Sequence, residues 1–418
     1  MRREVARRSI DAIWRIESAK IIAALARRVG DVGLAEELAQ EALVAALEQW
    51  PEAGVPENPG AWLMATAKNR GIDELRGRAR RERKHAELAL ESSDAHDPAA
   101  ALLAELDDDV GDELLALMFV ACHPVLSPDA RAALTLRLLG GLETPEIARA
   151  FLIPEATVAQ RIVRAKRALA EARVPFEVPR GADRQARLSS VLEVVYLIFN
   201  EGYSASAGDD WLRPRLAEEA LRLGRVLVGI APHEPEVHGL LALMELHASR
   251  AGARIGSNGE PVLLLEQDRS RWDTLLIQRG LGALDRATSL GGARGFYALQ
   301  AAISACHARA PAPEDTDWPK IAELYTELAE LAPSPVIELN RGVAVAMAFG
   351  PSAGLELLDG LRSEPSLERY HLLPAARADL LVKLGRIAEA RDELQRAMKL
   401  AGNARDQELL RARLRGLG

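Results

Sequence analysis

The sequence predicts an all-α protein, and three observations support this fold class. Ala, Leu, Arg and Glu dominate the 418 residues, and only 4% of the residues are aromatic. This mix favours helices over sheets. Almost no window alternates apolar and polar residues as a half-buried strand does. The length allows roughly two to four domains with a sizeable core.

The cysteine content and the hydrophobic pattern also indicate where in the cell the protein works. The two cysteines, Cys122 and Cys306, lie far apart in the sequence, which fits a reducing cytosol and argues against a disulfide scaffold. No apolar run approaches the ~20 residues that a membrane span needs. The N-terminus is basic at first but soon carries Asp11 and Glu17, so it lacks the apolar core of a signal peptide. We therefore expect a cytoplasmic protein.

The charge is distributed in alternating blocks. The net charge of −8 by itself argues against a simple DNA-binding protein. Residues 61–90 carry eight Lys or Arg against four Asp or Glu, and residues 131–173 carry the same excess. Residues 91–113 carry nine acidic residues and no Lys or Arg. This basic, acidic, basic order indicates two basic modules joined by an acidic tether.

The first expected domain covers residues 1–90 and begins with two helices. Residues 10–29 form an amphipathic helix, residues 30–33 form a turn, and residues 34–50 form a second helix. The exposed face of the second helix is expected to carry Glu36, Glu37, Gln40, Glu41 and Glu48.

A third helix, at residues 58–83, has two faces of different chemistry. Its apolar stripe is expected to consist of Ala61, Met64, Ala65, Ile72, Leu75 and Ala79, interrupted by Lys68. Another face carries Trp62, Thr66, Asn69, Asp73 and Arg76. An aromatic ring, an amide and a guanidinium on one face suit stacking and hydrogen bonding to an unpaired base, and the basic end suits phosphates. Taken alone, the helix is equally well explained as a surface helix with a solvated, charged end.

An acidic linker at residues 91–109 leads to a second expected domain at residues 110–174. Residues 114–122 and 128–139 are expected to be supporting helices, and residues 141–169 have the pattern of a helix-turn-helix, with Thr144 as N-cap. The buried stripe of its second helix is Val158, Ile162, Ala165 and Leu169. The opposite face carries Gln160, Arg164 and Arg167, with Arg161 and Lys166 on the flanks. Such a face suits the major groove of duplex DNA, although an ordinary helical hairpin is the alternative.

The third expected domain, residues 184–418, is helical throughout. Gly350 and Gly385 occupy matching places 35 residues apart, each between an apolar helix and a second helix. This spacing is similar to that of tetratricopeptide (TPR) repeats. A helical solenoid presents a concave surface, which favours a protein-binding role, although a purely structural role is the alternative.

The sequence does not favour an enzyme. Cysteine and histidine are adjacent in sequence in two pairs, Cys122–His123 and Cys306–His307. Adjacent side chains on a helix do not face each other, so neither histidine is placed to act on its cysteine. Neither pair has metal-ligand spacing. No dinucleotide-binding, phosphate-loop or serine-hydrolase motif occurs. The polar stretch at residues 199–203 is better explained as a helix end, with Gly202 in a left-handed cap. We expect no catalytic residue, no cofactor and no metal.

The first two parts resemble a bacterial extracytoplasmic-function (ECF) sigma factor of RNA polymerase. Residues 30–51 resemble the core-binding helix of the sigma-2 domain, and residues 58–81 resemble its promoter-melting and recognition helix. Residues 141–169 resemble the sigma-4 helix-turn-helix. The resemblance runs continuously from residue 1 to about residue 174. The third part resembles the C-terminal repeat extension of one sigma subgroup, through YLIFNEGY, ELNRGVAVA and YHLLPAARADLLVKLGR.

The resemblance implies a role for particular residues. Core polymerase would bind Glu37, Gln40 and Glu41. The melted strand of the start-proximal promoter element would contact Trp62, Asn69, Arg70, Asp73, Arg76 and Arg80. The upstream element would be read as duplex by Thr157, Gln160, Arg161, Arg164, Lys166 and Arg167. Val163 makes this last face less polar than its neighbours suggest.

The resulting hypothesis is a promoter-specificity subunit with a C-terminal domain that regulates activity or binds core polymerase or another partner. Its partners would be core RNA polymerase and promoter DNA, both as duplex and as melted strand, with no membrane. One alternative is a stand-alone helix-turn-helix regulator with a TPR-like interaction domain. Another is a repeat scaffold whose N-terminal modules are incidental.

Overall fold

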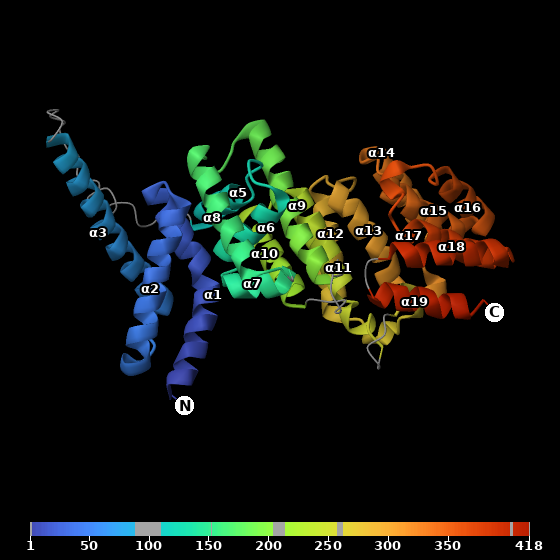
Figure 1. The fold of residues 1–418 in the computed structure, drawn as a ribbon, viewed down its shortest axis with the longest axis horizontal. Helices are drawn as coiled ribbons and strands as arrows, with labels where there is room; N and C mark the ends of the chain where they lie inside the picture. The colour runs from blue at the N-terminus through green and yellow to red at the C-terminus, as the bar shows by residue number, and fades with distance from the viewer. Residues whose placement is uncertain are drawn as a thin grey trace. The chain divides into compact units, whose positions relative to one another are not determined.

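The computed structural model describes residues 2–87, 110–151, 153–203, 214–256, 262–401 and 404–417. Within these ranges the regular elements are all helices, as the composition predicts (Figure 1). The expected acidic linker falls outside the described residues. The chain divides into two compact units, Met1–Leu197 and Ile198–Gly418, which are taken in turn. Among the described helices, none combines the length and the hydrophobicity that a membrane span requires.

The first unit begins with three helices that pack against one another: α1 (Arg2–Val29), α2 (Val32–Ala53) and α3 (Pro59–Glu87) (Figure 1). Gly30 closes the first turn with a φ of 67°, a conformation that glycine adopts without strain. Asp31 is the N-cap of α2, and its carboxylate accepts hydrogen bonds from two backbone N–H groups of the first turn at 2.7 and 3.1 Å.

The buried side of α3 differs from the predicted apolar stripe. The structure buries Leu63, Ala67 and Ile72, whereas Ala61 and Ala65, which were expected to face the core, are exposed. The side chains of two further expected members, Leu75 and Ala79, lie outside the described residues. The physical reason is the size of Leu63, because a side of α3 that buries Leu63 removes more apolar area from water than one that buries Ala61 and Ala65.

The described residues of the first unit contain five further helices, with the bounds α5 (Val110–Ala121), α6 (Pro128–Leu138), α7 (Thr144–Phe151), α8 (Glu155–Glu171) and α9 (Gly181–Tyr203). Helix α5 is buried from Leu114 onward and packs against α1. Helices α7 and α8 form the expected helix-turn-helix and rest on α6. The first turn of α7 is held by the Glu146 carboxylate, which accepts a hydrogen bond from the backbone N–H of Glu143 at 2.9 Å. Helix α9 continues into the second unit.

The second unit consists of helices that pack against their neighbours in sequence (Figure 1). After the last residues of α9, their bounds are α10 (Pro214–Ile230), α11 (Pro235–Ala248), α12 (Thr274–Ser289), α13 (Phe296–Arg309), α14 (Trp318–Leu331), α15 (Pro335–Phe349), α16 (Pro351–Gly360), α17 (Leu372–Lys383), α18 (Ile387–Leu400) and α19 (Ala404–Arg415). Gly350 and Gly385 have φ values of 103° and 73° and stand between α15 and α16 and between α17 and α18. Each glycine therefore lies between an apolar helix and a second helix, as the sequence predicts.

Gly202 packs closely instead of capping a helix, so the expectation of a left-handed cap was wrong. Helix α9 continues to Tyr203, and Gly202 is not among the glycines with positive φ. A Cβ atom at this position would lie 2.3 Å from the backbone nitrogen of Ala217. The missing side chain therefore lets the end of α9 approach α10.

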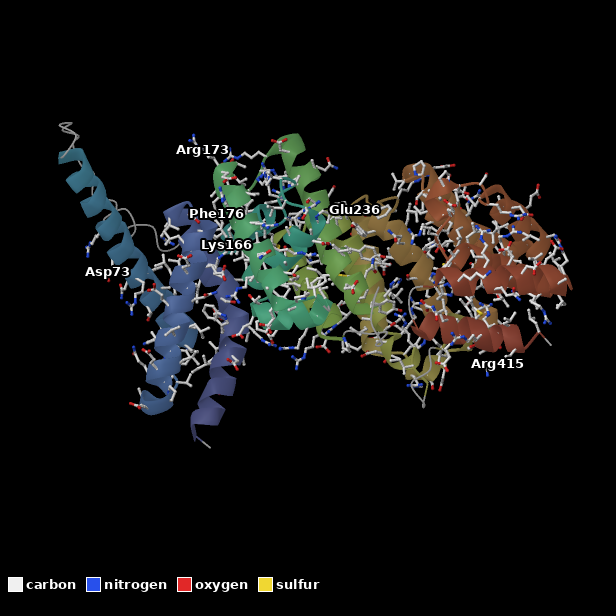
Figure 2. The ribbon with its side chains drawn as sticks, viewed as in Figure 1. Asp73, Lys166, Arg173, Phe176, Glu236 and Arg415 are labelled. Carbon is white, nitrogen blue, oxygen red and sulfur yellow. The ribbon has the colours of Figure 1, made fainter. Side chains whose placement is uncertain are left out.

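Two carboxylates, those of the half-buried Glu236 and the buried Glu393, tie helices of the second unit together. Glu236, on α11, accepts hydrogen bonds from the backbone N–H groups of Tyr297 and Ala298 at 2.9 and 3.3 Å, and so caps the start of α13 (Figure 2). Glu393, on α18, accepts from the buried Arg377 of α17 at 3.0 Å. Burial raises the pKa of Glu236, and the backbone hydrogen bonds oppose this shift.

Candidate nucleic-acid and polymerase interface

The polar face of α3 is open to solvent where the sequence predicts contact with single-stranded DNA. Asn69, Arg70, Asp73 and Arg76 are exposed, and Asp73 lies on the outer side of the helix (Figure 2). The side chain of Arg80 lies outside the described residues. An amide, a carboxylate and guanidinium groups on one exposed face are able to hydrogen-bond base edges and phosphates.

Trp62 stands at the start of this face, but the structure holds it partly against the protein. Its ring meets the buried Trp50 ring edge-on, with centroids 5.3 Å apart and an interplanar angle of 67°. Its backbone carbonyl accepts a hydrogen bond from the Thr66 hydroxyl at 2.9 Å. The ring contact holds the indole against Trp50, and Trp62 is half-buried rather than fully buried, so part of it remains available for stacking.

The predicted polymerase-binding residues of α2 occupy three different environments. Glu37 is exposed and has no ion pair within the described residues. Glu41 is also exposed, and its carboxylate lies 3.7 Å from Arg70 Nε of α3. Both side chains of this pair are 55% exposed, so the pair contributes at most about 1 kcal/mol. Gln40 is half-buried and points toward a neighbouring carboxylate.

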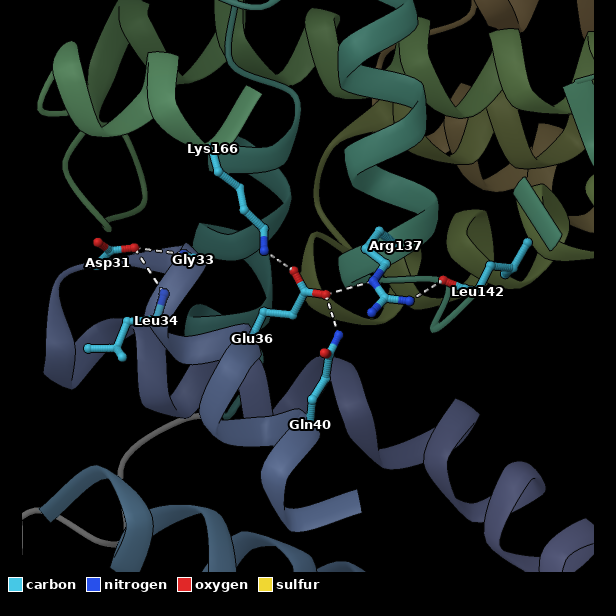
Figure 3. A network of polar contacts seen from close by, with 8 residues as sticks. All are labelled: Asp31, Gly33, Leu34, Glu36, Gln40, Arg137, Leu142 and Lys166. Atoms are coloured by element: carbon cyan, nitrogen blue, oxygen red, sulfur yellow. Dashed lines mark hydrogen bonds and ion pairs between the residues drawn. The ribbon is translucent and has the colours of Figure 1, made fainter. Parts of the chain in front are cut away.

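That carboxylate belongs to Glu36, which the sequence wrongly assigned to the exposed face. Glu36 is only 3% exposed and connects three helices (Figure 3). Its Oε1 accepts hydrogen bonds from Gln40 Nε2 and from Arg137 Nε of α6, each at 2.6 Å. Its Oε2 lies 2.5 Å from Lys166 Nζ of α8. We call these four residues the Glu36 network.

The recognition helix α8 has the two faces that its sequence predicts. Val158, Ile162, Ala165 and Leu169 are buried. The opposite face is exposed and consists of Gln160, Val163, Arg164 and Arg167, at the i, i+3, i+4, i+7 spacing of one helical stripe. Val163 is 63% exposed, so an apolar patch interrupts the cationic face.

The flanking residues of α8 are less available than its central stripe. Thr157 is half-buried. Arg161 forms an ion pair with Asp129 of α6 at 3.0 Å, and Lys166 belongs to the Glu36 network. Arg167 pairs with Glu171 one turn further along α8 at 2.7 Å, and this hydrogen bond raises the pKa of Arg167. Among the predicted DNA-reading residues of α8, Gln160 and Arg164 thus have no side-chain partner within the described residues.

Further contacts join the helices of the first and second expected domains. Arg15 of α1 pairs with Glu146 of α7 at 2.7 Å, and Arg27 of α1 lies 3.6 Å from the buried Glu113 of α5. A cavity of about 420 Å³ lies next to Lys166, between the turn that precedes α2 and the end of α8. In this structure the two basic modules are therefore docked on each other, and the Glu36 network is the most buried polar part of the contact.

The sequence analysis missed Glu36 and Arg137 as functional residues. A weak signal was present, because Glu36 precedes two exposed acidic positions but follows Ala35, which is fully buried. Nothing in a single sequence pairs it with Arg137, which is 101 residues away.

The two cysteine–histidine pairs show no catalytic geometry in the structure. Burial raises the pKa of Cys122 to about 12, and its sulfur lies 3.4 Å from the Thr135 hydroxyl. Burial also raises the pKa of Cys306. Both thiols are therefore poor nucleophiles near neutral pH. In the part of the chain that the structure describes, no three His, Cys, Asp or Glu side chains are grouped so as to hold a metal ion.

Three family models match the chain, in the same order as the described helices. The Sigma-70 region 2 model matches residues 16–81, which cover α2, the second half of α1 and most of α3. The Sigma-70 region 4 model matches residues 116–169, which include the helix-turn-helix. A family of unknown function (DUF6596) matches residues 187–288, from α9 to α12.

Two kinds of relatives are similar to the chain. An uncharacterized protein of Rhizobium meliloti (strain 1021) is 44% identical over 392 residues, which cover 94% of this chain and 92% of that protein. A probable ECF RNA polymerase sigma factor of Mycobacterium tuberculosis, SigI, is 30% identical over 174 residues, which cover 40% of this chain and 57% of that protein. No solved structure matches the chain.

Proposed function

Because this chain belongs to the ECF sigma factors, which direct transcription initiation, we propose that α2 docks on core RNA polymerase while α3 and α8 recognise the two promoter elements. Core polymerase and promoter DNA are the partners that this family implies. In this proposal Glu37, Gln40 and Glu41 meet the polymerase. The exposed face of α3 receives the melted strand, and the exposed face of α8 enters the duplex.

One observation carries the proposal. A single chain presents two separate exposed faces with nucleic-acid chemistry, at Asn69, Asp73 and Arg76 on α3 and at Gln160 and Arg164 on α8. The first face offers hydrogen bonds next to the aromatic ring of Trp62, which suits unstacked bases. The second offers an amide and a guanidinium on a helix-turn-helix, which suits base edges in the major groove. The chain breaks no bond in this role and acts only through differential binding.

The docked arrangement of the two modules adds a step to this mechanism. Lys166 and Gln40 both contact Glu36, so neither is free for DNA or polymerase while the Glu36 network is intact. We infer that binding to core polymerase separates α8 from α2 and releases both side chains. Core polymerase would then hold the two readers at the spacing of the promoter elements, which raises their effective concentration without new contacts.

In vitro transcription tests the function directly. The purified full chain, mixed with core polymerase and a library of genomic templates, is expected to give promoter-dependent transcripts that core alone does not give. If the chain neither binds core nor produces a transcript from any template, the proposal fails. If it binds a specific duplex with high affinity in the absence of core, the stand-alone regulator becomes the better explanation.

Arg164→Ala tests the assignment of the recognition helix. Arg164 is exposed and has no partner among the described residues, so its removal is expected to leave the fold and core binding unchanged. Loss of one bidentate base contact costs about 1–3 kcal/mol, or roughly 5- to 150-fold in promoter binding by the holoenzyme. Arg294→Ala is the control, because it removes an arginine that is 72% exposed on the second unit. Equal promoter binding by the two variants would contradict the assignment.

The C-terminal helices are proposed to regulate this activity or to bind a partner. Stacked helical hairpins present extended surfaces of the kind that solenoid proteins use for binding. A cytoplasmic location follows from the proposed polymerase partner.

A further inference from the structure

The segment that joins α11 to α12 in the second unit is rich in arginine. It spans residues 249–273, of which 257–261 lie outside the described residues. It also lies within the stretch that matches the family of unknown function. Arg254, Arg269 and Arg271 all donate hydrogen bonds to backbone carbonyl oxygens. These three side chains therefore have internal partners that explain their position.

Arg250 differs from the other three arginines. It is only 9% exposed, and its guanidinium makes no hydrogen bond or ion pair with any described residue. Its Cζ lies 5.9 Å from the centre of the Trp272 ring, and the Arg269 Cζ lies 5.1 Å from the same ring. Two guanidinium groups therefore lie close to one indole ring. A buried charge without a counter-ion is strongly unfavourable, so such groups are normally paired or bound to a ligand.

Two buried histidines show that the potential around Arg250 is positive. Burial, followed by the charges of Arg250 and Arg269, lowers the pKa of His307 to about 4. Burial, followed by Arg250 and Arg254, lowers the pKa of His247 well below its usual value. Both rings are therefore neutral near pH 7, and each keeps one nitrogen, Nδ1, buried without a partner.

Unsatisfied polar atoms are concentrated in this neighbourhood. Among the described residues, twelve buried side-chain N or O atoms lack a hydrogen-bond partner, and six belong here. They are His247 Nδ1, Arg250 Nε, Gln267 Oε1, Arg269 Nε, Trp272 Nε1 and His307 Nδ1. The Arg and Trp atoms are obligate donors, and a neutral histidine is able to donate from Nδ1. Five of the six atoms donate or are able to donate, and only Gln267 Oε1 is an acceptor, so the group is short of acceptors. Buried donors usually have an acceptor.

We propose that Arg250 and its neighbours bind an oxyanion, the phosphate or carboxylate group of a small ligand. The guanidinium supplies the charge, and Trp272 and His307 supply further N–H donors. Hydrogen bonds from charged donors to an oxyanion are among the strongest in proteins. The proposal does not depend on the role in transcription, because these groups all lie within the unit Ile198–Gly418. Under this proposal the C-terminal domain responds to the binding of a small molecule.

Calorimetric titration and thermal unfolding of the full chain test this proposal. The probes are inorganic phosphate, pyrophosphate and citrate at constant ionic strength, so that phosphate is distinguished from carboxylate. Arg250→Met removes the charge and keeps a long side chain. Arg377→Met is the matched control, because Arg377 is as deeply buried, at 4% exposure, but is paired with Glu393 at 3.0 Å and with Asp359. Trp272→Phe keeps the ring and removes its N–H donor.

The wild-type chain is expected to bind at least one of these anions saturably. Arg250→Met should weaken that binding roughly tenfold or more, and Trp272→Phe should weaken it less, whereas Arg377→Met should retain it. Without any anion, Arg250→Met should unfold at the same temperature as the wild type or higher, because a lone buried charge is gone. Arg377→Met should unfold several degrees lower. Saturable binding of none of the probes by the wild type, or unchanged binding in both Arg250→Met and Trp272→Phe, would overturn the proposal.

Discussion

At the scale of single residues, Glu37 is the carboxylate proposed for polymerase contact that has no ion pair among the described residues. It is exposed on α2, and no ion pair within the described residues competes for it. Glu41 has a weak pair with Arg70, and Gln40 is bound to Glu36. Glu37 is therefore the position at which a substitution should affect docking without affecting the fold.

Glu37→Lys is expected to weaken core binding by roughly tenfold, because a reversed charge at an electrostatically complementary interface is repulsive. The control is Glu48→Lys, which reverses an exposed charge further along the same helix. Fluorescence anisotropy of labelled chain titrated with core polymerase measures both. Equal affinities for the two variants would remove Glu37 from the interface, and unchanged circular dichroism would show that α2 is intact.

Neighbouring residues show how far the sequence predicts the site. Glu37 and Glu36 are adjacent, and the 3.6-residue period correctly predicts the exposure of Glu37. The same period fails for Glu36, because its burial depends on Arg137 and Lys166, which arrive from distant helices. A helical period reports local amphipathicity, and it contains no information about a polar partner on another element.

At the scale of elements, the Glu36 network is the contact that the proposed mechanism must break. It joins α2 to α6 and α8 through a carboxylate that is almost fully buried. Arg137 and Lys166 remain about one fifth exposed, so they are able to regain water when the helices separate. Removing the Glu36 carboxylate alone is therefore costly, because its cationic partners stay largely buried without it. Separating the helices costs less, because all the charged groups then regain water.

Glu36→Gln is expected to destabilise the docked arrangement by about 3 kcal/mol, because two cations lose a buried counter-ion. Fluorescent labels at Glu48→Cys on α2 and Glu171→Cys on α8 measure the separation by energy transfer. The native thiols should label slowly, because Cys122 is buried and the pKa values of both cysteines are raised. We expect Glu36→Gln to lower transfer in the free chain, as core polymerase does in the wild type.

Glu37→Gln is the control for that measurement, because it removes the neighbouring carboxylate without touching α6 or α8. It should leave energy transfer unchanged in the free chain. A Glu36→Gln variant with the same transfer as Glu37→Gln would show that the network does not hold the modules together.

The helices themselves were predicted better than their orientations. The helices expected at residues 34–50 and 58–83 are observed as α2 (Val32–Ala53) and α3 (Pro59–Glu87). Capping residues and repeated glycines are local signals, so they fix where helices begin and end. The rotation of α3 was wrong because alanines occur on both of its sides, and only packing against α1 and α2 selects Leu63 and Ala67.

At the scale of the whole molecule, the second unit is expected to be acid-sensitive. The folded pKa of His307 is about 4 and its ordinary value is 6.5, so the unfolded chain binds this proton first as the pH falls. The contribution of neutral His307 to the free energy of unfolding is therefore fully present above pH 6.5 and is lost progressively down to about pH 4. The loss is on the order of 3 kcal/mol for this shift.

Urea unfolding of the wild type and of His307→Gln between these pH values measures the effect. The variant lacks the titrating ring, so its stability should fall less steeply with acid. The comparison is needed because burial raises the pKa values of Glu236 and Glu245, which oppose the trend. His233→Gln, at an exposed position, should follow the wild type. Parallel curves for all three proteins would contradict the buried, neutral state of His307.

The order of the modules could be predicted from the sequence, and their internal chemistry only in part. Blocks of charge and two helical motifs were sufficient to place a sigma factor before a repeat-like region. The group around Arg250 was not predicted, because His247, Trp272 and His307 belong to separate elements that only the fold brings near one another. Arg250 is an unsatisfied charge only because it is buried, and burial depends on the whole fold.

Helix α9 determines where the chain is able to be cut without damage to either unit. The division between the two units falls inside the helix, between Leu197 and Ile198. Upstream of it, Ser190 and Glu193 accept hydrogen bonds from Arg131, and Ser190 also donates to the carbonyl of Cys122 at 2.7 Å. A gene truncated after Val174 would remove these contacts together with the C-terminal part. Loss of activity in such a shortened protein would therefore report damage to the promoter-reading half as much as the absence of a regulator.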